Sequence, residues 1–322
     1  MQEIIVGPGD DGLRLDVWLV RRTEAGSRAR ASEWIERGKI FLNGREAAGR
    51  DRATRVGAGD RVGLWIDRPG SSRSPDAAVA GARPSLRVVY EDASIAIVDK
   101  PAGLLVEPLP RDAGSEPTVL DLLLDRARHL ARARYYVVHR IDRDTSGLVL
   151  FARTAAARDR LKAQFEAQTP ERVYLAVTLG QVRADSGTWR DRLAWDTSSL
   201  RQRRAHGKDA GGKEAVSRYR VRERFGAATL LEVSLVTGKR NQIRVQAAMR
   251  GHPLLGERQY RFGAIDEPAD LPRIGRQALH AWRLSFHHPE SGRRVGFVSE
   301  VPSDLDRLLR ALDVLKTKIR CR

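Results

Sequence analysis

The fold is decided by one stretch near the middle of the chain, Tyr135-Tyr136-Val137-Val138-His139-Arg140-Ile141-Asp142-Arg143-Asp144-Thr145-Ser146-Gly147-Leu148-Val149-Leu150-Phe151-Ala152. Its two ends are apolar and rich in β-branched and aromatic residues, which favours two strands. The polar residues between them predict a connecting turn. Because two strands would hold this turn, it is a rigid place for the carboxylates Asp142 and Asp144. From the residues alone, a solvated structural turn and a reactive loop both fit.

The order of residues in this turn resembles the signature of the RluA-type RNA pseudouridine synthases. The matching string is His-Arg-Ile-Asp-x-x-Thr-Ser-Gly-Leu-x-Leu-x-Ala-Arg, residues 139–153. Enzymes of that family isomerise uridine in RNA, and the resemblance implies that Asp142 is the catalytic carboxylate. It also implies RNA contacts by His139 and by Arg140, which is placed to fill the gap left by a flipped-out uridine. Asp144 lies outside the His-Arg-x-Asp pattern and is expected to have a structural or RNA-positioning role.

Two later segments continue the resemblance. Residues 172–176 match the family pattern basic-x-Tyr-x-Ala, which implies that Tyr174 is an active-site residue; the residues alone indicate only a half-buried strand aromatic. Residues 238–244 resemble the family string Gly-Arg-Thr-His-Gln-Ile-Arg, which implies that Arg244 pairs with the catalytic Asp and keeps it ionised. The sequence departs from the family pattern at four positions, Lys239, Arg240, Asn241 and Glu257.

A small N-terminal module, from about Asp11 to Trp65, resembles an S4 RNA-binding domain. Matching pieces are Arg-Leu-Asp-x-x-Leu at residues 14–19 and Gly-Asp-x-Val at residues 59–62. Between them a helix capped by Ser27 is predicted, with basic side chains on its outer surface. These side chains either track an RNA backbone or form an ordinary solvated helix face. Beside the synthase signature we expect RNA contact, and the predicted contact residues are Arg28, Arg30, Arg37 and Lys39.

The composition is that of a folded, basic, cysteine-poor protein. The chain has 322 residues, of which 41% are hydrophobic and 31% are charged, and Lys and Arg exceed Asp and Glu by 58 to 41. This excess favours a polyanionic partner, with nucleic acid preferred to a membrane. The single cysteine, Cys321, excludes an internal disulfide or a cysteine zinc site. No apolar run approaches the roughly 20 residues that span a bilayer, and no signal peptide is evident, so we expect a cytoplasmic protein.

The chain is predicted to be an α+β protein with three parts. Residues 1–66 are the S4-like domain, residues 67–84 are a flexible linker, and residues 85–322 are the catalytic domain. Periodicity predicts helices over residues 118–132 and 155–168, and a mobile basic loop over residues 195–212. The resemblance implies a central, mostly antiparallel sheet in the catalytic domain, whereas periodicity alone gives mixed α and β.

The resemblance implies an isomerase that converts specific uridines to pseudouridine, with 23S ribosomal RNA as the expected substrate and transfer RNA as the second. The reaction breaks the C1′–N1 bond and rejoins the uracil through C5, so neither a cofactor nor a metal is expected. Asp142 either attacks C1′ or removes a sugar proton, and the sequence leaves both routes open. We expect a monomer.

Two alternatives remain at the level of function. One is an RNA-binding chaperone of ribosome assembly, whose catalysis is secondary. The other is a different enzyme on the same fold, such as a base deaminase, but the sequence lacks the Cys-x-x-Cys zinc signature. The histidines near the C-terminal end, His280, His287 and His288, lack the further ligands that a metal site needs.

Overall fold

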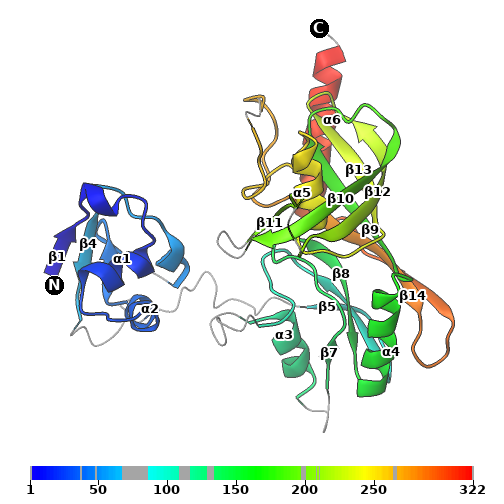
Figure 1. Ribbon diagram of the computed structural model, residues 1–322, viewed down its shortest axis with the longest axis horizontal. Helices are drawn as coiled ribbons and strands as arrows, with labels where there is room; N and C mark the ends of the chain where they lie inside the picture. Colours follow the sequence, from blue (N-terminus) through cyan, green and yellow to red (C-terminus); the bar gives the residue numbers. More distant parts are fainter. Residues whose placement is uncertain are drawn as a thin grey trace. The chain divides into compact units, whose positions relative to one another are not determined.

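The computed structural model describes residues 2–36, 38–47, 49–66, 86–108, 117–128, 134–196, 201–207, 209, 211–263 and 267–320. The chain divides into two compact units, Met1–Ser85 and Leu86–Arg322, whose elements are labelled in Figure 1. The predicted linker, residues 67–84, lies outside the described residues. No helix in the described part of the chain is long and apolar enough to cross a membrane.

The N-terminal unit packs two helices against a four-stranded sheet of strand order β1-β4-β2-β3. Its elements are β1 (Gln2–Ile5), α1 (Leu15–Arg22), α2 (Arg28–Glu36), β2 (Ile40–Leu42), β3 (Arg45–Glu46) and β4 (Arg61–Leu64). Leu15, Trp18 and Leu19 are fully buried, so the i, i+3, i+4 pattern of α1 faces the core. The predicted cap of α2 is confirmed, because Ser27 Oγ accepts a hydrogen bond from Arg30 N at 3.2 Å.

The C-terminal unit is built on an 11-stranded sheet. Its strands are β5 (Arg87–Glu91), β6 (Ile95–Lys100), β7 (Tyr136–Val137), β8 (Ser146–Ala152), β9 (Glu171–Leu179), β10 (Ser186–Asp196), β11 (Arg201–Arg204), β12 (Lys213–Arg224), β13 (Ala228–Leu235), β14 (Leu279–His287) and β15 (Arg294–Val298). Its helices are α3 (Val119–Arg126), α4 (Ala155–Glu166), α5 (Gln242–Met249) and α6 (Ser303–Arg320). Among the described strands, β8 and β14 run parallel and the other pairs are antiparallel. The predicted α+β fold with a mostly antiparallel sheet is confirmed.

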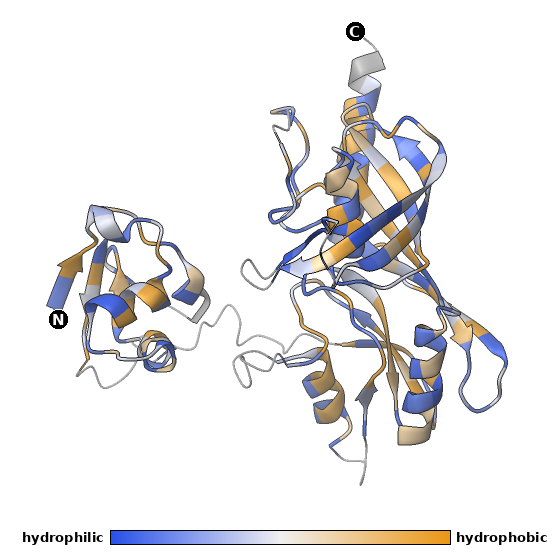
Figure 2. Cartoon of the chain, viewed as in Figure 1, coloured by the Kyte–Doolittle hydropathy of each residue, from blue (hydrophilic) through white to orange (hydrophobic). Residues whose placement is uncertain are grey.

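Different helices cover the two faces of this sheet. Successive strand residues point to opposite faces, so Val149 of β8 packs with α3 whereas Leu150 packs with α4. On β9, Val177 packs with α6 and Tyr174 packs with α5. Helices α4 and α6 each carry both apolar and polar residues, as Figure 2 shows, as expected of helices with one face on the sheet. The alternation brings Tyr174 to the face covered by α5, the helix that carries Arg244.

The predicted helices are present, with one boundary changed. Thr154 caps α4 by accepting a hydrogen bond from Ala157 N at 3.1 Å, as its position in the sequence predicts. Thr118 caps α3 in a capping box with Asp121. This helix ends at Arg126 and not at residue 132, and residues 129–133 lie outside the described part of the chain.

The predicted mobile basic loop over residues 195–212 is wrong in its first half. Strands β10 and β11 pair there as an antiparallel hairpin, with Trp195 opposite Gln202 and Ala194 opposite Arg203. The inward residue of β11 is Gln202, which is buried, while Arg201 is exposed. A strand whose inward side chain is polar has no apolar alternation, and the sequence therefore looks like a loop.

Candidate active site

The signature segment forms β7, a polar turn and β8, as predicted, and a buried lysine fixes the turn. Lys100, at the end of β6, is fully buried. Its Nζ donates to Arg143 O at 2.7 Å and to two carbonyl oxygens of the turn that follows β6, at 3.0 and 2.9 Å. Burial lowers the pKa of Lys100 to about 7. In the charged form, each of the three N–H groups of the ammonium has one carbonyl oxygen as its acceptor. The backbone beside Asp142 is thereby held against β6.

The Ser-Gly pair at the end of the turn lies where two strands approach closely. Gly147 has φ of +110°, and a Cβ there would collide with the backbone of Ala281. Its neighbour Ser146 pairs with His280 in the parallel ladder, and Ser146 Oγ lies 3.0 Å from His280 Nδ1. A side chain at position 147 would therefore push β14 away and shift the turn.

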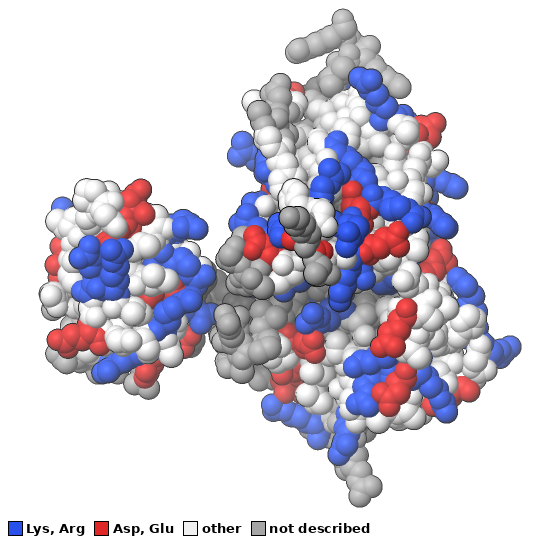
Figure 3. Space-filling model, in the orientation of Figure 1, with Lys and Arg blue, Asp and Glu red and all other residues white. Residues whose placement is uncertain are grey.

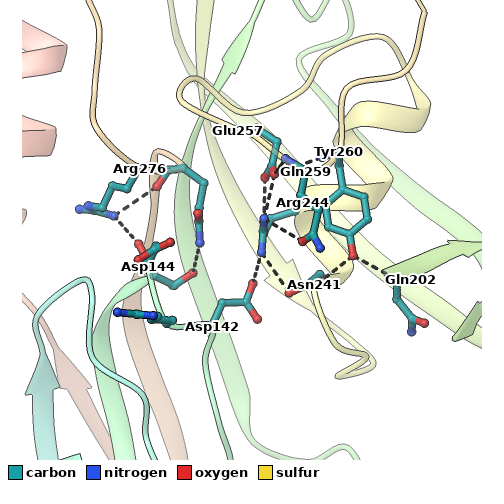
Figure 4. A network of polar contacts seen from close by, with 12 residues as sticks. Asp142, Asp144, Gln202, Asn241, Arg244, Glu257, Gln259, Tyr260 and Arg276 are labelled. Carbon is teal, nitrogen blue, oxygen red and sulfur yellow. Dashed lines mark hydrogen bonds and ion pairs between the residues drawn. The ribbon is translucent and has the colours of Figure 1, made fainter. Parts of the chain in front are cut away.

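Asp142 and Arg244, which are far apart in the sequence, meet across the cleft. Arg244 Nη1 donates to Asp142 Oδ2 at 3.2 Å, from the first turn of α5 to the loop before β8 (Figure 4). Arg244 is 9% exposed, and the side chain of Asp142 is 23% exposed. This contact is the one that the family resemblance implies. The carboxylate keeps one open side, which is what a group that meets a substrate requires.

Glu257 is the principal partner of Arg244, and sequence reasoning missed its role. Arg244 Nε and Nη2 donate to the two oxygens of Glu257 at 2.7 and 2.8 Å, and the Glu257 side chain is fully buried. Such a bidentate pair fixes the plane of the guanidinium. The sequence signal was present, because position 257 carries an acidic residue where the family has Asp; only the structure reveals what it binds.

A second layer of contacts extends from Arg244 to the hairpin. Asn241 Oδ1 accepts a hydrogen bond from Arg244 Nη1 at 3.1 Å, and Asn241 Nδ2 donates to Tyr260 Oη at 2.9 Å. The same phenol oxygen accepts a hydrogen bond from Gln202 N in β11 at 3.1 Å (Figure 4). Asn241 has φ of 54°, a left-handed conformation that asparagine tolerates better than most residues. Asn241, which departs from the family pattern, thus adopts the left-handed backbone conformation and also links Arg244 to Tyr260 by hydrogen bonds.

Burial dominates the electrostatics of Asp142. Desolvation raises the pKa of its carboxyl above the ordinary value; the adjacent Arg244 opposes this shift, and the charge of Glu257 adds to it. Burial lowers the pKa of Arg244, but the bonds to Glu257 and Asp142 outweigh it, so the net shift is upward and the guanidinium stays charged. Arg244 therefore favours the ionised carboxylate, as expected, but does not fully cancel the effect of burial on the pKa of Asp142.

Tyr174 lines the same cavity as Asp142 and Arg244. The cavity has a volume of about 600 Å³, within the usual size of a site for one small ligand. Tyr174 is 7% exposed, and burial raises the pKa of its phenol to about 12, so the hydroxyl is neutral near pH 7. The structure thus brings together the three predicted catalytic residues: a carboxylate, an arginine and a neutral phenol.

The two residues before the carboxylate have different surroundings. His139 stacks on Phe165 with ring centroids 4.8 Å apart, and its Nε2 accepts a hydrogen bond from Leu150 N at 3.0 Å. Burial lowers the pKa of His139 to about 3, so the ring is neutral and its described contacts lie within the protein. Arg140 is exposed at the cavity wall and pairs with Glu107 at 3.1 Å. Of the two, Arg140 is the better placed to meet RNA.

The predicted RNA contacts of the N-terminal unit lie on α2 and in the segment between α2 and β2. Arg28 pairs with the buried Asp16 at 2.8 Å, and the Arg30 guanidinium lies over the Trp34 ring at 5.7 Å. Lys39 Nζ donates to Ile66 O. Arg37 lies outside the described residues. Lys and Arg side chains gather on the visible face of this unit, and a further group lies on the C-terminal unit (Figure 3).

Neither the sequence nor the site points to a metal. Among the described residues, no group of three or more His, Cys, Asp or Glu side chains is arranged to hold one. Of the three histidines considered from the sequence, His280 is bonded to Ser146, and His288 Nε2 lies 2.9 Å from Asp92 Oδ2.

Comparison with known families gives matches to both units. The model of the RNA pseudouridylate synthase family matches residues 94–249, and that of the S4 domain matches residues 13–62. The chain is 38% identical over 97% of its length to the ribosomal large subunit pseudouridine synthase D of Xanthomonas campestris, covering 92% of that protein. It is 36% identical over 96% of its length to the protein of the same name in Nitrosomonas europaea, covering 87% of it.

A solved structure shares the fold over a large part of this chain at lower identity. Human RNA pseudouridylate synthase domain containing 4 superposes with a TM-score of 0.57 at 19% identity, over 70% of this chain and 92% of the human one. At this identity the likeness establishes the fold alone.

Proposed function

This chain belongs to the RNA pseudouridylate synthase family and is an RNA pseudouridine synthase, and on that premise we propose that it modifies uridines of ribosomal large-subunit RNA. Two close relatives are named for activity on the ribosomal large subunit, and the match extends over nearly the whole chain. The N-terminal S4 match adds an RNA-binding module. The observation that carries the proposal is the partly open Asp142 carboxylate, paired with Arg244 at the wall of a cavity.

We propose that Asp142 is the group that acts on the ribose. Isomerisation breaks the C1′–N1 bond, turns the uracil and forms a C1′–C5 bond, after which the C5 proton is lost and N1 is protonated. Asp142 either bonds to C1′ and is later displaced, or takes a ribose proton and later returns it. Both routes need the ionised carboxylate, and the bond from Arg244 Nη1 favours that form.

Tyr174 and Arg140 complete the proposed site. Tyr174 lies two strands from Asp142 in the same cavity, where its ring offers a stacking face to the uracil and its hydroxyl a hydrogen bond near C5. Because the target uridine must leave its stack, the exposed Arg140 would fill the gap in the RNA. His139 is proposed to contact RNA only through the edge of its ring that lines the cavity.

We assign RNA capture to residues 1–66 and catalysis to residues 85–322, joined by a linker over residues 67–84. The exposed basic side chains of α2, together with Lys39, would contact phosphates and provide affinity with little sequence selection. Selection of the target uridine then belongs to the cavity and its rim.

Three finer assignments accompany this proposal. We propose that the enzyme acts as a monomer, because Asp142, Tyr174 and Arg244 all come from one chain. Transfer RNA is the second substrate class, since the same chemistry acts on any uridine that can be flipped out. A ribosomal RNA substrate implies action in the cytoplasm.

The test is a pseudouridine map of all cellular RNA in cells that lack this gene. The same cells are mapped after rescue with the wild-type gene or with Asp142→Asn. We expect large-subunit ribosomal sites that are lost on deletion and restored by the wild type only. Sites restored only in transfer RNA would select the second substrate. Restoration of growth and ribosome assembly by Asp142→Asn, without modification, would establish a separate chaperone role.

A further inference from the structure

Two of the arginines that line the catalytic cavity are buried, and their partners differ sharply. Arg244 forms ion pairs with the carboxylates of Glu257 and Asp142. Arg172, in β9, is equally buried at 8% exposure, but no ion pair joins it to any carboxylate of the described residues. Its Nε is buried without a hydrogen-bond partner, and its one recorded bond is a long one, from Nη2 to Val236 O at 3.4 Å.

The Arg172 guanidinium reaches the cavity. Arg172 and Tyr174 are two positions apart on β9, so their side chains leave the same face of the sheet. The guanidinium lies over the Phe165 ring at 5.5 Å, and a Cβ at Gly238 would collide with its Nη1. Residues 165, 172, 174 and 238 all line the cavity. Glycine at position 238 therefore leaves one edge of the guanidinium uncovered.

An unpaired buried guanidinium is energetically unfavourable if Arg172 has only a structural role. Taking a charge out of water is unfavourable unless a counter-charge or hydrogen bonds compensate for the lost hydration. Burial accordingly lowers the pKa of Arg172, and Tyr174 opposes this shift without cancelling it. The stacking on Phe165 would be retained by an apolar side chain of similar length. A negatively charged ligand would provide the counter-charge and the hydrogen-bond acceptors that Arg172 lacks among the described residues.

We propose that Arg172 is a binding residue for a backbone phosphate of the RNA strand that enters the catalytic cavity. This deepens the proposed function and rests on it. Lys239 lines the same cavity, and no ion pair joins it to a described residue, so a second cation is available to the phosphate.

The spacing of the site favours a phosphate over a base carbonyl. The Cα atoms of residues two apart on a strand are about 6.6 Å apart, so the side chains of Arg172 and Tyr174 can both meet one nucleotide. If Tyr174 faces the uracil, Arg172 therefore lies where the adjoining phosphate passes. A planar guanidinium with a free edge also matches phosphate geometry better than a single carbonyl oxygen.

The experiment measures RNA binding and thermal stability of the full-length protein, with a large-subunit ribosomal RNA transcript as the probe. The variants are Arg172→Met, which keeps apolar bulk on Phe165, and Arg172→Lys, which keeps the charge. The control is Arg222→Gln, because Arg222 belongs to the same sheet, lies over an aromatic ring and pairs with Glu232. Kd is measured against KCl concentration, and Tm is measured without RNA.

We expect Arg172→Met to weaken binding roughly 5- to 20-fold and to reduce the slope of log Kd against log salt by about 0.7, the value for one phosphate contact of a single strand. Its Tm should equal or exceed that of the wild type, because an uncompensated buried charge has been removed. Arg172→Lys should keep the slope, and Arg222→Gln should keep both slope and affinity.

An unchanged slope in Arg172→Met would overturn the phosphate site, and so would a lowered Tm with unchanged affinity, which marks a structural residue. A loss of affinity with the wild-type slope would assign Arg172 to the base instead and would equally reject the phosphate. Because Kd and pseudouridine formation are measured separately, failure of the proposed function is distinguishable from failure of the phosphate site. A wild type that binds this RNA without forming pseudouridine, while Arg172→Met shows the expected slope, would refute the substrate and leave the site standing.

Discussion

One arginine serves two carboxylates at the centre of this site, and the two carboxylates have different tasks. Glu257 is fully buried and takes two bonds from Arg244, so it fixes the guanidinium. Asp142 takes one longer bond of 3.2 Å and remains partly open. The pair with Glu257 thus holds the arginine in place, and the weaker pair leaves the Asp142 carboxylate able to turn toward the ribose, as the proposed mechanism requires.

The pH dependence of the reaction should report this arrangement. In the proposed mechanism Asp142 acts as a carboxylate, so we expect activity to be lost as pH falls through its pKa, which burial raises above the usual Asp value. Glu257→Gln removes a negative charge that contributes to this rise, so the acid limb of the single-turnover rate should move to lower pH. The plateau rate should fall roughly 10- to 100-fold, because charge-assisted bonds of about 1.5–3 kcal/mol no longer fix Arg244.

The matched control is Glu290→Gln, since Glu290 forms an exposed ion pair with Arg160. It should leave both the limb and the plateau unchanged. An acid limb that stays in place or moves to higher pH in Glu257→Gln would contradict the coupling between Glu257 and Asp142.

At the scale of elements, Tyr260 links the β10–β11 hairpin to α5. Its hydroxyl joins Gln202 N of the hairpin to Asn241 at the start of the helix, and its ring lies 5.2 Å from the Arg244 guanidinium. The basic side chains of β11 are therefore mounted on a strand that contacts the catalytic network. If RNA binding moves the hairpin, these contacts would change the position of the Arg244 guanidinium.

Tyr260→Phe tests this link by removing the hydroxyl and keeping the ring. Two hydrogen bonds are lost, so the free energy of unfolding should fall by about 1–2 kcal/mol in urea denaturation. Hydrogen exchange at the Gln202 amide should become faster, and turnover should decrease. Tyr90→Phe is the control, because Tyr90 is exposed and its hydroxyl donates to Asp92. Unchanged exchange at Gln202 in Tyr260→Phe would show that the hairpin is held by other contacts.

The sequence predicted those elements whose residues follow a local pattern. Strands β7 and β8, the caps Ser27 and Thr154, and the meeting of Asp142 with Arg244 could be anticipated from periodicity, capping chemistry and family motifs. Strand β11 could not, because its inward residue is Gln202 and its pairing with β10 is a tertiary effect.

The partners of Arg244 escaped prediction for a related reason. Glu257 and Tyr260 follow α5 in a segment that forms no helix or strand. This segment folds back so that both residues contact Arg244. Sequence spacing gives no measure of that distance. The same holds for Arg172, whose burial without a carboxylate is visible only when the surrounding residues are in place.

At the scale of the whole molecule, the net charge of +17 predicts binding that weakens strongly with salt. We propose that the exposed cations of α2 contribute to affinity and take no part in the chemistry. Arg30→Gln should therefore raise Kd for the RNA about two- to fivefold and lower the salt slope, with the single-turnover rate at saturating enzyme unchanged.

Arg310→Gln provides the comparison for Arg30, because Arg310 is an exposed helical arginine of the other unit and pairs with Asp306. It should bind RNA as the wild type does. Equal effects of the two substitutions would mean that general charge, and not the α2 surface, provides the affinity. A loss of single-turnover rate in Arg30→Gln would place that residue in the chemistry.

The central claim is that Asp142 performs the isomerisation, and the loop offers its own control in Asp144. Asp144 lies two residues further on, and its recorded bond is made by the backbone oxygen, which accepts from Arg276 Nη1 at 3.1 Å. The most direct measurement is pseudouridine formed in a large-subunit ribosomal RNA transcript by wild type, Asp142→Asn and Asp144→Asn, at enzyme concentrations that saturate binding. We predict no detectable product with Asp142→Asn and a rate within about tenfold of wild type with Asp144→Asn. Product formation by Asp142→Asn, or loss of activity in Asp144→Asn alone, would contradict the account.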